Sequence, residues 1–203
     1  LGFTGAPYTL ASYAIEGRTS KDFEHVKAWM YQRPESFMRL MDRLSDLVIA
    51  YILCQKAAGA EVVQMFDTWA GHLSKEDYAR FVCPSTERIL AAAKAHNLPL
   101  ILYCNGGSHL VPEMLALHPA CLSLDWRMSL KDYLAMIPDE VAVQGNLDPS
   151  CLYGTKDLVI QRTRELLAIG RARGRYILNL GHGLLPNTPI DNVKAFVDQA
   201  LAQ

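Results

Sequence analysis

Side chains that could bind or transform a small molecule follow short apolar runs along the whole chain. They form five groups: Asp67-Thr68, Cys104-Asn105-Gly106-Gly107, Asp125-Trp126, Gly145-Asn146-Leu147-Asp148-Pro149 and Gly181-His182-Gly183. Carboxylate, hydroxyl and imidazole groups bind charged ligands or transfer protons, and glycine lets a ligand approach the backbone closely. The pattern predicts a binding site built from several loops.

The opening segment, residues 1–17, has the pattern of a strand end, a tight turn and a helix start. Glycine and proline at positions 2, 5 and 7 interrupt an apolar run, Thr9 opens a short amphipathic stretch, and Gly17 ends it. Such junctions bring backbone close to ligands, and the first amides of a helix can meet an anion. From the pattern alone, a packing turn without a ligand is the alternative.

The elements that must position these groups alternate along the chain. Six short apolar segments predict strands at 2–3, 61–66, 98–103, 120–124, 141–144 and 176–180. Segments with apolar residues at three- and four-residue spacing predict helices that begin near Asp22, Pro34, Ser74, Leu110, Leu130, Thr155 and Ile190. Ser74 and Asp77 suggest a capping box, and Pro84 predicts an interruption in the helix that follows.

Alternating strands and helices predict an α/β fold with parallel strands and helical crossovers. A doubly wound sheet and a (β/α)8 TIM barrel both fit this order. Because polar or glycine-rich residues follow nearly every strand, the barrel is favoured, since all its strands end at one face. A complete barrel needs about 250 residues. We therefore expect residues 1–203 to form a single domain, an incomplete barrel lacking about the first two βα units.

The composition is that of an ordinary globular protein. The chain has 203 residues, of which 50% are hydrophobic, with 20 basic and 21 acidic side chains. This balance gives no reason to expect nucleic acid or an anionic membrane as a partner. The longest apolar stretch, residues 47–54, is too short to cross a bilayer, and no export signal opens the chain. We expect a cytoplasmic location.

The chain holds five cysteines, an odd number without CxxC spacing, which favours free, buried thiols over a disulfide framework. The chain also begins with Leu1 rather than methionine, directly on a predicted strand. We therefore expect a processed piece or a fragment of a longer protein.

The opening segment closely resembles a signature of the uroporphyrinogen decarboxylase family. The matching positions are Gly2, Phe3, Thr4, Gly5, Pro7, Tyr8, Thr9, Leu10, Tyr13, Glu16 and Gly17. Further motifs follow in the family's order, at 66–73, 124–126, 144–149 and 179–184. The resemblance covers essentially the whole chain and corresponds to the C-terminal three-fifths or so of the family's length.

The resemblance implies a (β/α)8 barrel, usually a homodimer, that uses no metal or organic cofactor. Such enzymes remove the four acetate carboxylates of uroporphyrinogen, a tetrapyrrole, to give coproporphyrinogen on the pathway to haem. The expected activity is therefore that of a carboxy-lyase.

Three residues match functional positions of the family. Tyr13 corresponds to the tyrosine that hydrogen-bonds near a substrate carboxylate and the catalytic aspartate, so catalytic and substrate-binding roles are implied. Thr68 occupies a serine or threonine position that contacts substrate. His182 corresponds to the histidine that binds a substrate carboxylate and could take part in proton delivery. Asp67, Asp125 and Asp148 are interpreted as caps of loops or helices rather than as catalytic acids.

The family's essential aspartate, and the arginine pair of an Arg-Gln-Ala-Gly-Arg-Tyr-like motif, precede the signature and are missing from this chain. We therefore expect the isolated 203 residues to be weakly stable and inactive.

Two other interpretations stay open. A zinc-dependent methyltransferase of the same barrel family could use Cys104 and His109, but the expected His-X-Cys ligand pair is absent. A non-catalytic half-barrel could instead serve as an interaction module for another chain. No sequence feature positively favours that role.

Overall fold

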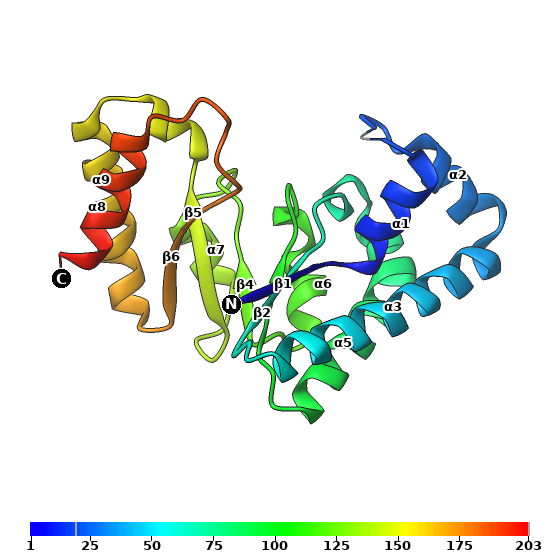
Figure 1. Ribbon diagram of the computed structural model, residues 1–203. Coiled ribbons are helices and arrows are strands. Elements are labelled where there is room, and N and C mark those ends of the chain that lie inside the picture. Colours follow the sequence, from blue (N-terminus) through cyan, green and yellow to red (C-terminus); the bar gives the residue numbers. More distant parts are fainter. Residues whose placement is uncertain (19, 203) are drawn as a thin grey trace. The chain divides into compact units, whose positions relative to one another are not determined.

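The computed structural model describes residues 1–18 and 20–202 and divides into two compact units, Leu1–Cys121 and Leu122–Gln203. Each unit is described by itself. In both, parallel strands alternate with helices, and the strand order follows the chain, β1-β2-β3 in the first unit and β4-β5-β6 in the second (Figure 1). The fold class is therefore α/β, as the alternating pattern predicts, with six of the strands of an incomplete barrel.

The first unit is built on three parallel strands, β1 (Gly2–Gly5), β2 (Val63–Phe66) and β3 (Leu100–Tyr103). Its helices are α1 (Pro7–Glu16), α2 (Glu24–Gln32), α3 (Pro34–Ala57), α4 (Lys75–Asp77), α5 (Cys83–Ala95) and α6 (Val111–Ala116). Gly5 pairs with Phe66, and Phe66 with Tyr103, so the three strands end at one level. The loops after these strands therefore start side by side.

The helices of the first unit pack through a buried aromatic cluster. Phe37 of α3 lies at its centre, with ring centroids 6.5 Å from Tyr8, 6.4 Å from Trp29 and 6.0 Å from Phe81. All three pairs meet edge to face, the geometry in which an aromatic pair adds about 0.5–1.5 kcal/mol beyond its burial. This cluster fixes α1, and with it the residues that α1 carries, against α2 and α3.

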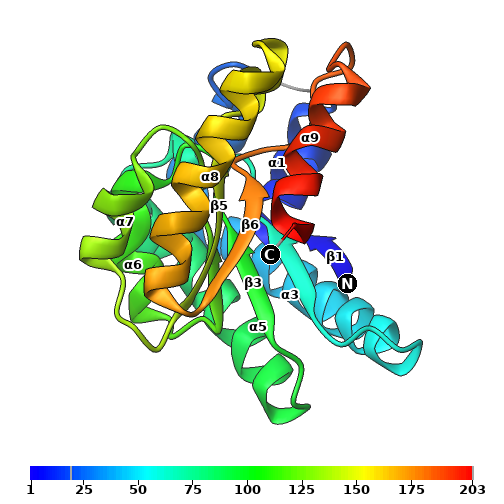
Figure 2. The same ribbon diagram turned by 90° about the vertical axis from the view of Figure 1, so that its left-hand side faces the viewer.

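The second unit contains β5 (Ala142–Leu147), β6 (Tyr176–Leu180) and all but the first residue of β4 (Cys121–Ser123). Its helices are α7 (Leu130–Met136), α8 (Lys156–Arg173) and α9 (Ile190–Leu201). Helices α8 and α9 pack side by side next to β6 (Figures 1 and 2). Leu147, Leu152, Val159 and Phe196 form the centre of its core, on which Leu178 and Leu180 also pack. Consequently Ile177, which alternates with those leucines along β6, points away from this core and is exposed, whereas Asn179 is partly buried.

All six predicted strands are present, and the two predicted helices at 130–136 and 190–201 have the expected bounds. The first helix begins at Pro7 rather than at Thr9, because the fixed φ of proline suits the first turn of a helix. Gly17 ends it with a φ of 65°.

The predicted cap is confirmed, because the hydroxyl of Ser74 accepts a hydrogen bond from the Asp77 amide at 3.1 Å. The helix is interrupted between Tyr78 and Val82 by a π-helical segment, just before Pro84 in the first turn of α5.

All five cysteines are free thiols, as expected, but the prediction that these thiols are buried holds for only two of them. Cys104 and Cys121 are buried, Cys83 and Cys151 are partly buried, and Cys54 is exposed on α3. Within the described residues, no helix is both long enough and apolar enough to cross a membrane.

Candidate functional site

Tyr13 stands on α1 and leaves 45% of its surface exposed, whereas Tyr8 and Ala11 on the same helix are fully buried. The edge of its ring meets Trp69, which follows β2, with centroids 5.8 Å apart and planes at 75°. Thr68 is half-buried and precedes Trp69 directly. Tyr13 thus contacts the residue that follows Thr68 in the chain, which brings these two predicted site residues to the same end of the first unit.

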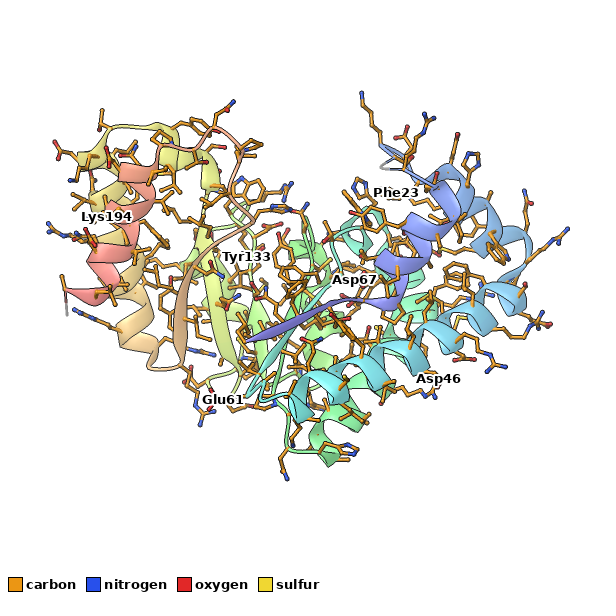
Figure 3. The ribbon with its side chains drawn as sticks, viewed as in Figure 1. Phe23, Asp46, Glu61, Asp67, Tyr133 and Lys194 are labelled. Atoms are coloured by element: carbon orange, nitrogen blue, oxygen red, sulfur yellow. The ribbon has the colours of Figure 1, made fainter. Side chains whose placement is uncertain are left out.

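Asp67 connects the end of β2 to the start of α1. Its carboxylate is fully buried, and the Thr9 hydroxyl donates a hydrogen bond to Oδ1 at 2.8 Å (Figure 3). The Trp69 amide in turn donates to the Thr9 hydroxyl at 3.3 Å. Since Thr9 lies about one helical turn before Tyr13, this network fixes the helix that carries Tyr13 to the loop that carries Thr68.

The second carboxylate oxygen of Asp67, Oδ2, is buried and has no hydrogen-bond partner among the described residues. Burial raises the pKa of Asp67 to about 7, and the hydrogen bond from Thr9 opposes that rise only in part. A carboxyl group in such surroundings is held neutral up to near-neutral pH, because removing a charge from water costs more than one hydrogen bond returns. The contact between Asp67 and Thr9 joins the end of β2 to the first turns of α1, in agreement with the interpretation of Asp67 as a cap.

Gly71 lets the loops after β2 and β3 touch. A Cβ atom at this position would lie 2.1 Å from the backbone oxygen of Asn105, closer than any side chain can come. His72 packs its ring on Phe23 at 4.9 Å, and His109 bonds through Nε2 to the Leu73 carbonyl oxygen at 2.9 Å. Both histidines thus help to hold the loops in place.

The loop after β4 is organised by the buried carboxylate of Asp125. Its Oδ1 accepts hydrogen bonds from the Arg127 amide at 2.9 Å and from the Tyr133 hydroxyl at 3.1 Å. Oδ2 accepts one from the Arg127 guanidinium at 2.9 Å. Tyr133, labelled in Figure 3, comes from α7, so Asp125 joins β4, its loop and α7. These hydrogen bonds confirm the predicted role of Asp125 as a cap. The hydrogen bond from the Ser150 amide to the Asp148 carboxylate confirms the same role for Asp148.

His182 follows β6 and is exposed. Its ring meets Trp126 at a centroid distance of 6.2 Å and an angle of 89°. The Gly183 amide lies 2.7 Å from Nδ1 and donates to it, so the neutral ring carries its proton on Nε2 and can donate that proton to an anion. Gly181 allows the loop after β6 to lie against the backbone of Trp126, because a Cβ atom at position 181 would lie 2.7 Å from the Trp126 amide nitrogen.

The ring beside His182 is that of Trp126, which belongs to the predicted group Asp125-Trp126, whereas Arg127 was not predicted as part of a site. The Trp126 ring contacts both His182 and Arg127, whose guanidinium carbon is 4.4 Å from the indole centroid. The sequence Asp-Trp-Arg after a strand was the one feature that could have indicated this arrangement. However, an aspartate at a strand end does not by itself indicate which side chain will donate hydrogen bonds to it.

The residues predicted for the zinc alternative do not form a donor set in the described part of the chain. Between residues 1 and 202, position 19 apart, no three His, Cys, Asp or Glu side chains come together in a way that could hold a metal ion. His109 contacts a backbone carbonyl oxygen instead. The zinc alternative thus gains no support from this part of the protein.

The fold also occurs in a solved protein of low sequence similarity, a methyltransferase from Methanosarcina mazei. The match has a TM-score of 0.84 at 21% identity, covering 99% of this chain and 58% of that one. Together with strands that alternate with helices and end in polar loops, this defines the class as a (β/α)-barrel protein.

The profile of the family described as uroporphyrinogen decarboxylase (URO-D) matches residues 1–202, and the chain belongs to that family. It is 42% identical over 201 residues to the uroporphyrinogen decarboxylase of Prochlorococcus marinus strain MIT 9303, covering 98% of this chain and 56% of that protein. It is 44% identical over 187 residues to that of Oceanobacillus iheyensis, covering 92% and 54%. The chain thus spans a little over half the length of these relatives.

Proposed function

We propose that the protein to which this chain belongs is a uroporphyrinogen decarboxylase, a carboxy-lyase that converts the four acetate side chains of uroporphyrinogen to methyl groups. The observation that carries the proposal is the uninterrupted family match over residues 1–202. The exposed Tyr13 on α1 and the exposed His182 after β6, each packed on a tryptophan, support it.

The reaction needs an electron sink but no external oxidant or reductant. When the pyrrole ring beside an acetate is protonated, the bond to the carboxylate can break, and its electron pair flows into the ring as carbon dioxide leaves. The remaining exocyclic carbon then takes up a proton to become a methyl group, and the ring loses its extra proton. The protein must neutralise the other carboxylates, stabilise the cationic ring and exclude water.

The three predicted site residues suit these tasks. The Tyr13 hydroxyl and the Thr68 hydroxyl can each donate a hydrogen bond to a substrate carboxylate. His182 can donate through Nε2 to a carboxylate and, when protonated, can deliver a proton. We assign Tyr13 and His182 catalytic and substrate-binding roles and Thr68 a substrate-binding role.

Further features follow from the family assignment as proposals. Residues 1–203 belong to one barrel domain, which the continuous family match supports. The protein acts as a homodimer in the cytoplasm, on a tetrapyrrole substrate, without a metal or organic cofactor. Sedimentation of the complete protein tests the dimer.

The proposal is tested by site variants assayed for consumption of uroporphyrinogen. Thr68→Val and His182→Gln, each in the complete reading frame that contains this chain, should lower turnover by about 10- to 1,000-fold. His96→Gln is the matched control, because this exposed histidine directly follows α5 and its ring bonds to the Ala92 carbonyl oxygen of the preceding helical turn. Full turnover by the His182 variant would contradict the role assigned to His182.

A further inference from the structure

Phe23 has a backbone conformation that bulky residues rarely adopt. It directly precedes α2, with a φ of 54° and a ψ of 41°, in the left-handed region where an aromatic residue is an outlier. Its side chain is nonetheless buried. Backbone strain of this kind persists only where the surrounding contacts enforce it, and it gathers at functional sites. The contacts of Phe23 therefore indicate what this conformation holds in place.

The ring of Phe23, which Figure 3 labels, packs on the loop after β2. Its centroid lies 5.1 Å from that of the Trp69 ring and 4.9 Å from that of the His72 ring. The Trp69 and His72 rings are themselves 6.5 Å apart, so all three rings contact one another. The Trp69 amide also donates a hydrogen bond to the Thr9 hydroxyl of α1 at 3.3 Å. Trp69 is therefore fixed through its ring and through its backbone.

The last residue of α1, Glu16, holds the start of α2. Its Oε1 atom accepts hydrogen bonds from the amides of His25 and Val26, both at 3.0 Å, which satisfies free N–H groups in the first turn of α2. Tyr13 lies three residues before Glu16, and Phe23 directly precedes α2. The ends of the two helices are thus joined, and each end carries an aromatic ring that packs on Trp69.

The Trp69 ring is the aromatic surface on which Tyr13 packs, with centroids 5.8 Å apart and planes at 75°. Because 45% of Tyr13 is exposed, this contact limits the directions that its hydroxyl can take. The indole nitrogen Nε1 of Trp69 is buried and has no hydrogen-bond partner among the described residues. The packing surface of the indole, rather than its N–H group, therefore acts on Tyr13.

We propose that Trp69, supported by Phe23, is a positioning residue that directs the Tyr13 hydroxyl toward a substrate carboxylate. This inference rests on the proposed function and on the role assigned there to Tyr13. A hydrogen bond weakens steeply when its angle or distance departs from the favoured geometry. A tyrosine that is free to sample several rotamers therefore loses much of its effect on the reaction, although its hydroxyl is still present.

The test is a double-mutant cycle on kcat/KM for uroporphyrinogen in the complete protein. Trp69→Leu removes the aromatic surface and Trp69→Phe keeps a smaller one. Each is made in the parent and in Tyr13→Phe, which lacks the hydroxyl. Trp29→Leu is the matched control, since this half-buried tryptophan of α2 packs on Phe37 of the buried aromatic cluster, with centroids 6.4 Å apart.

We expect Trp69→Leu to lower kcat/KM by about 10- to 100-fold in the parent, but by less than about twofold in Tyr13→Phe, where no hydroxyl remains to be positioned. Trp69→Phe should recover most of the loss, and Trp29→Leu should have the same effect in both backgrounds. Equal losses from Trp69→Leu in both backgrounds would overturn the inference, since they describe a purely structural role. Parent-like turnover by Trp69→Leu would overturn it too.

If Trp69→Leu does not fold, Phe23→Leu replaces it in the cycle, because this change withdraws the ring behind Trp69 and leaves Trp69 in place. Equal losses in both backgrounds then reject the inference.

The affinity of the same variants for uroporphyrin, the stable oxidised form with the same carboxylates, is measured by calorimetry. If the parent binds uroporphyrin but does not turn over uroporphyrinogen, the proposed activity fails and the cycle is evaluated from the dissociation constants. A loss from Trp69→Leu that disappears in Tyr13→Phe then supports the positioning role, and equal losses reject it. A parent protein with neither turnover nor binding would overturn both proposals.

Discussion

The hydroxyl of Thr9 and the carboxylate of Asp67 form a buried hydrogen bond of 2.8 Å between positions 58 residues apart in the chain. Thr9 lies in the first turns of α1, and Asp67 follows β2 directly. Because Tyr13 stands on that helix and Thr68 follows that aspartate, this bond sets the distance between two proposed site residues. The first three predictions concern this connection and what it holds in place.

Thr9→Val should destabilise the protein by about 1–3 kcal/mol, because it leaves a buried carboxylate oxygen without its donor at nearly unchanged side-chain volume. Denaturant unfolding of the purified protein measures the change. Thr4→Val is the matched control, since the Thr4 hydroxyl bonds only to the neighbouring Gly5 carbonyl oxygen at 3.1 Å. Equal stability of the two variants would show that the Thr9 hydroxyl contributes nothing.

The stability contributed by Asp67 should fall as the pH rises. Burial raises the pKa of this carboxyl to about 7 in the folded protein, against an ordinary value of 3.8. Its contribution is therefore complete at low pH, where the group is protonated in both states, and is lost between about pH 4 and pH 7, by up to about 4 kcal/mol. Asp67→Asn removes the titration.

The measurement compares the unfolding free energies of the parent and Asp67→Asn proteins across this pH range. The advantage of the parent over the variant should shrink steadily as the pH rises. A difference that is constant, or that grows with pH, would mean that the carboxyl is ionised in the folded protein.

Tyr13→Phe should lower uroporphyrinogen turnover by at least about tenfold and leave the stability within about 0.5 kcal/mol, because the ring keeps its edge contact with Trp69. Tyr51→Phe is the control, since this tyrosine is half exposed on α3, outside the proposed site. If both variants turn over substrate like the parent, the Tyr13 hydroxyl has no part in the reaction.

Gly181→Ala should destabilise the protein by about 1–3 kcal/mol and weaken uroporphyrin binding, because the new methyl group meets the Trp126 backbone, which cannot move aside without displacing the loop. Gly183→Ala adds a methyl group where no atom lies within 4 Å, so its stability should match that of the parent. Unfolding curves for the two variants separate the cases, and identical curves would disprove the close contact at Gly181.

The order of elements could be predicted from the sequence because local patterns determine it. Short β-branched and apolar runs such as the one ending at Phe66 mark buried parallel strands, and three-to-four spacing marks the helices between them. The start of α1 was placed two residues late, because the amphipathic stretch opens at Thr9 whereas the helix begins at Pro7. In the structure the Thr9 hydroxyl bonds to Asp67, a partner that no local pattern could indicate.

The candidate site could be predicted only where it depends on single residues with a recognised motif. Tyr13, Thr68 and His182 were predicted in this way; Tyr13 lies in the last turns of α1, and Thr68 and His182 follow β2 and β6. The contacts of Arg127 were not predicted, because they depend on stacking with Trp126 and on the burial of Asp125. Both contacts arise only in the folded protein. The sequence Asp-Trp-Arg alone does not show whether its arginine makes them or is simply exposed to solvent.

Chromatography of the products formed from uroporphyrinogen is the measurement to make first, on this chain and on the complete reading frame that contains it. We predict that the complete protein yields coproporphyrinogen, in which all four acetates have become methyl groups, through intermediates that have lost one to three carboxylates. A folded complete protein that binds uroporphyrin but releases only unchanged uroporphyrinogen would contradict the proposed activity.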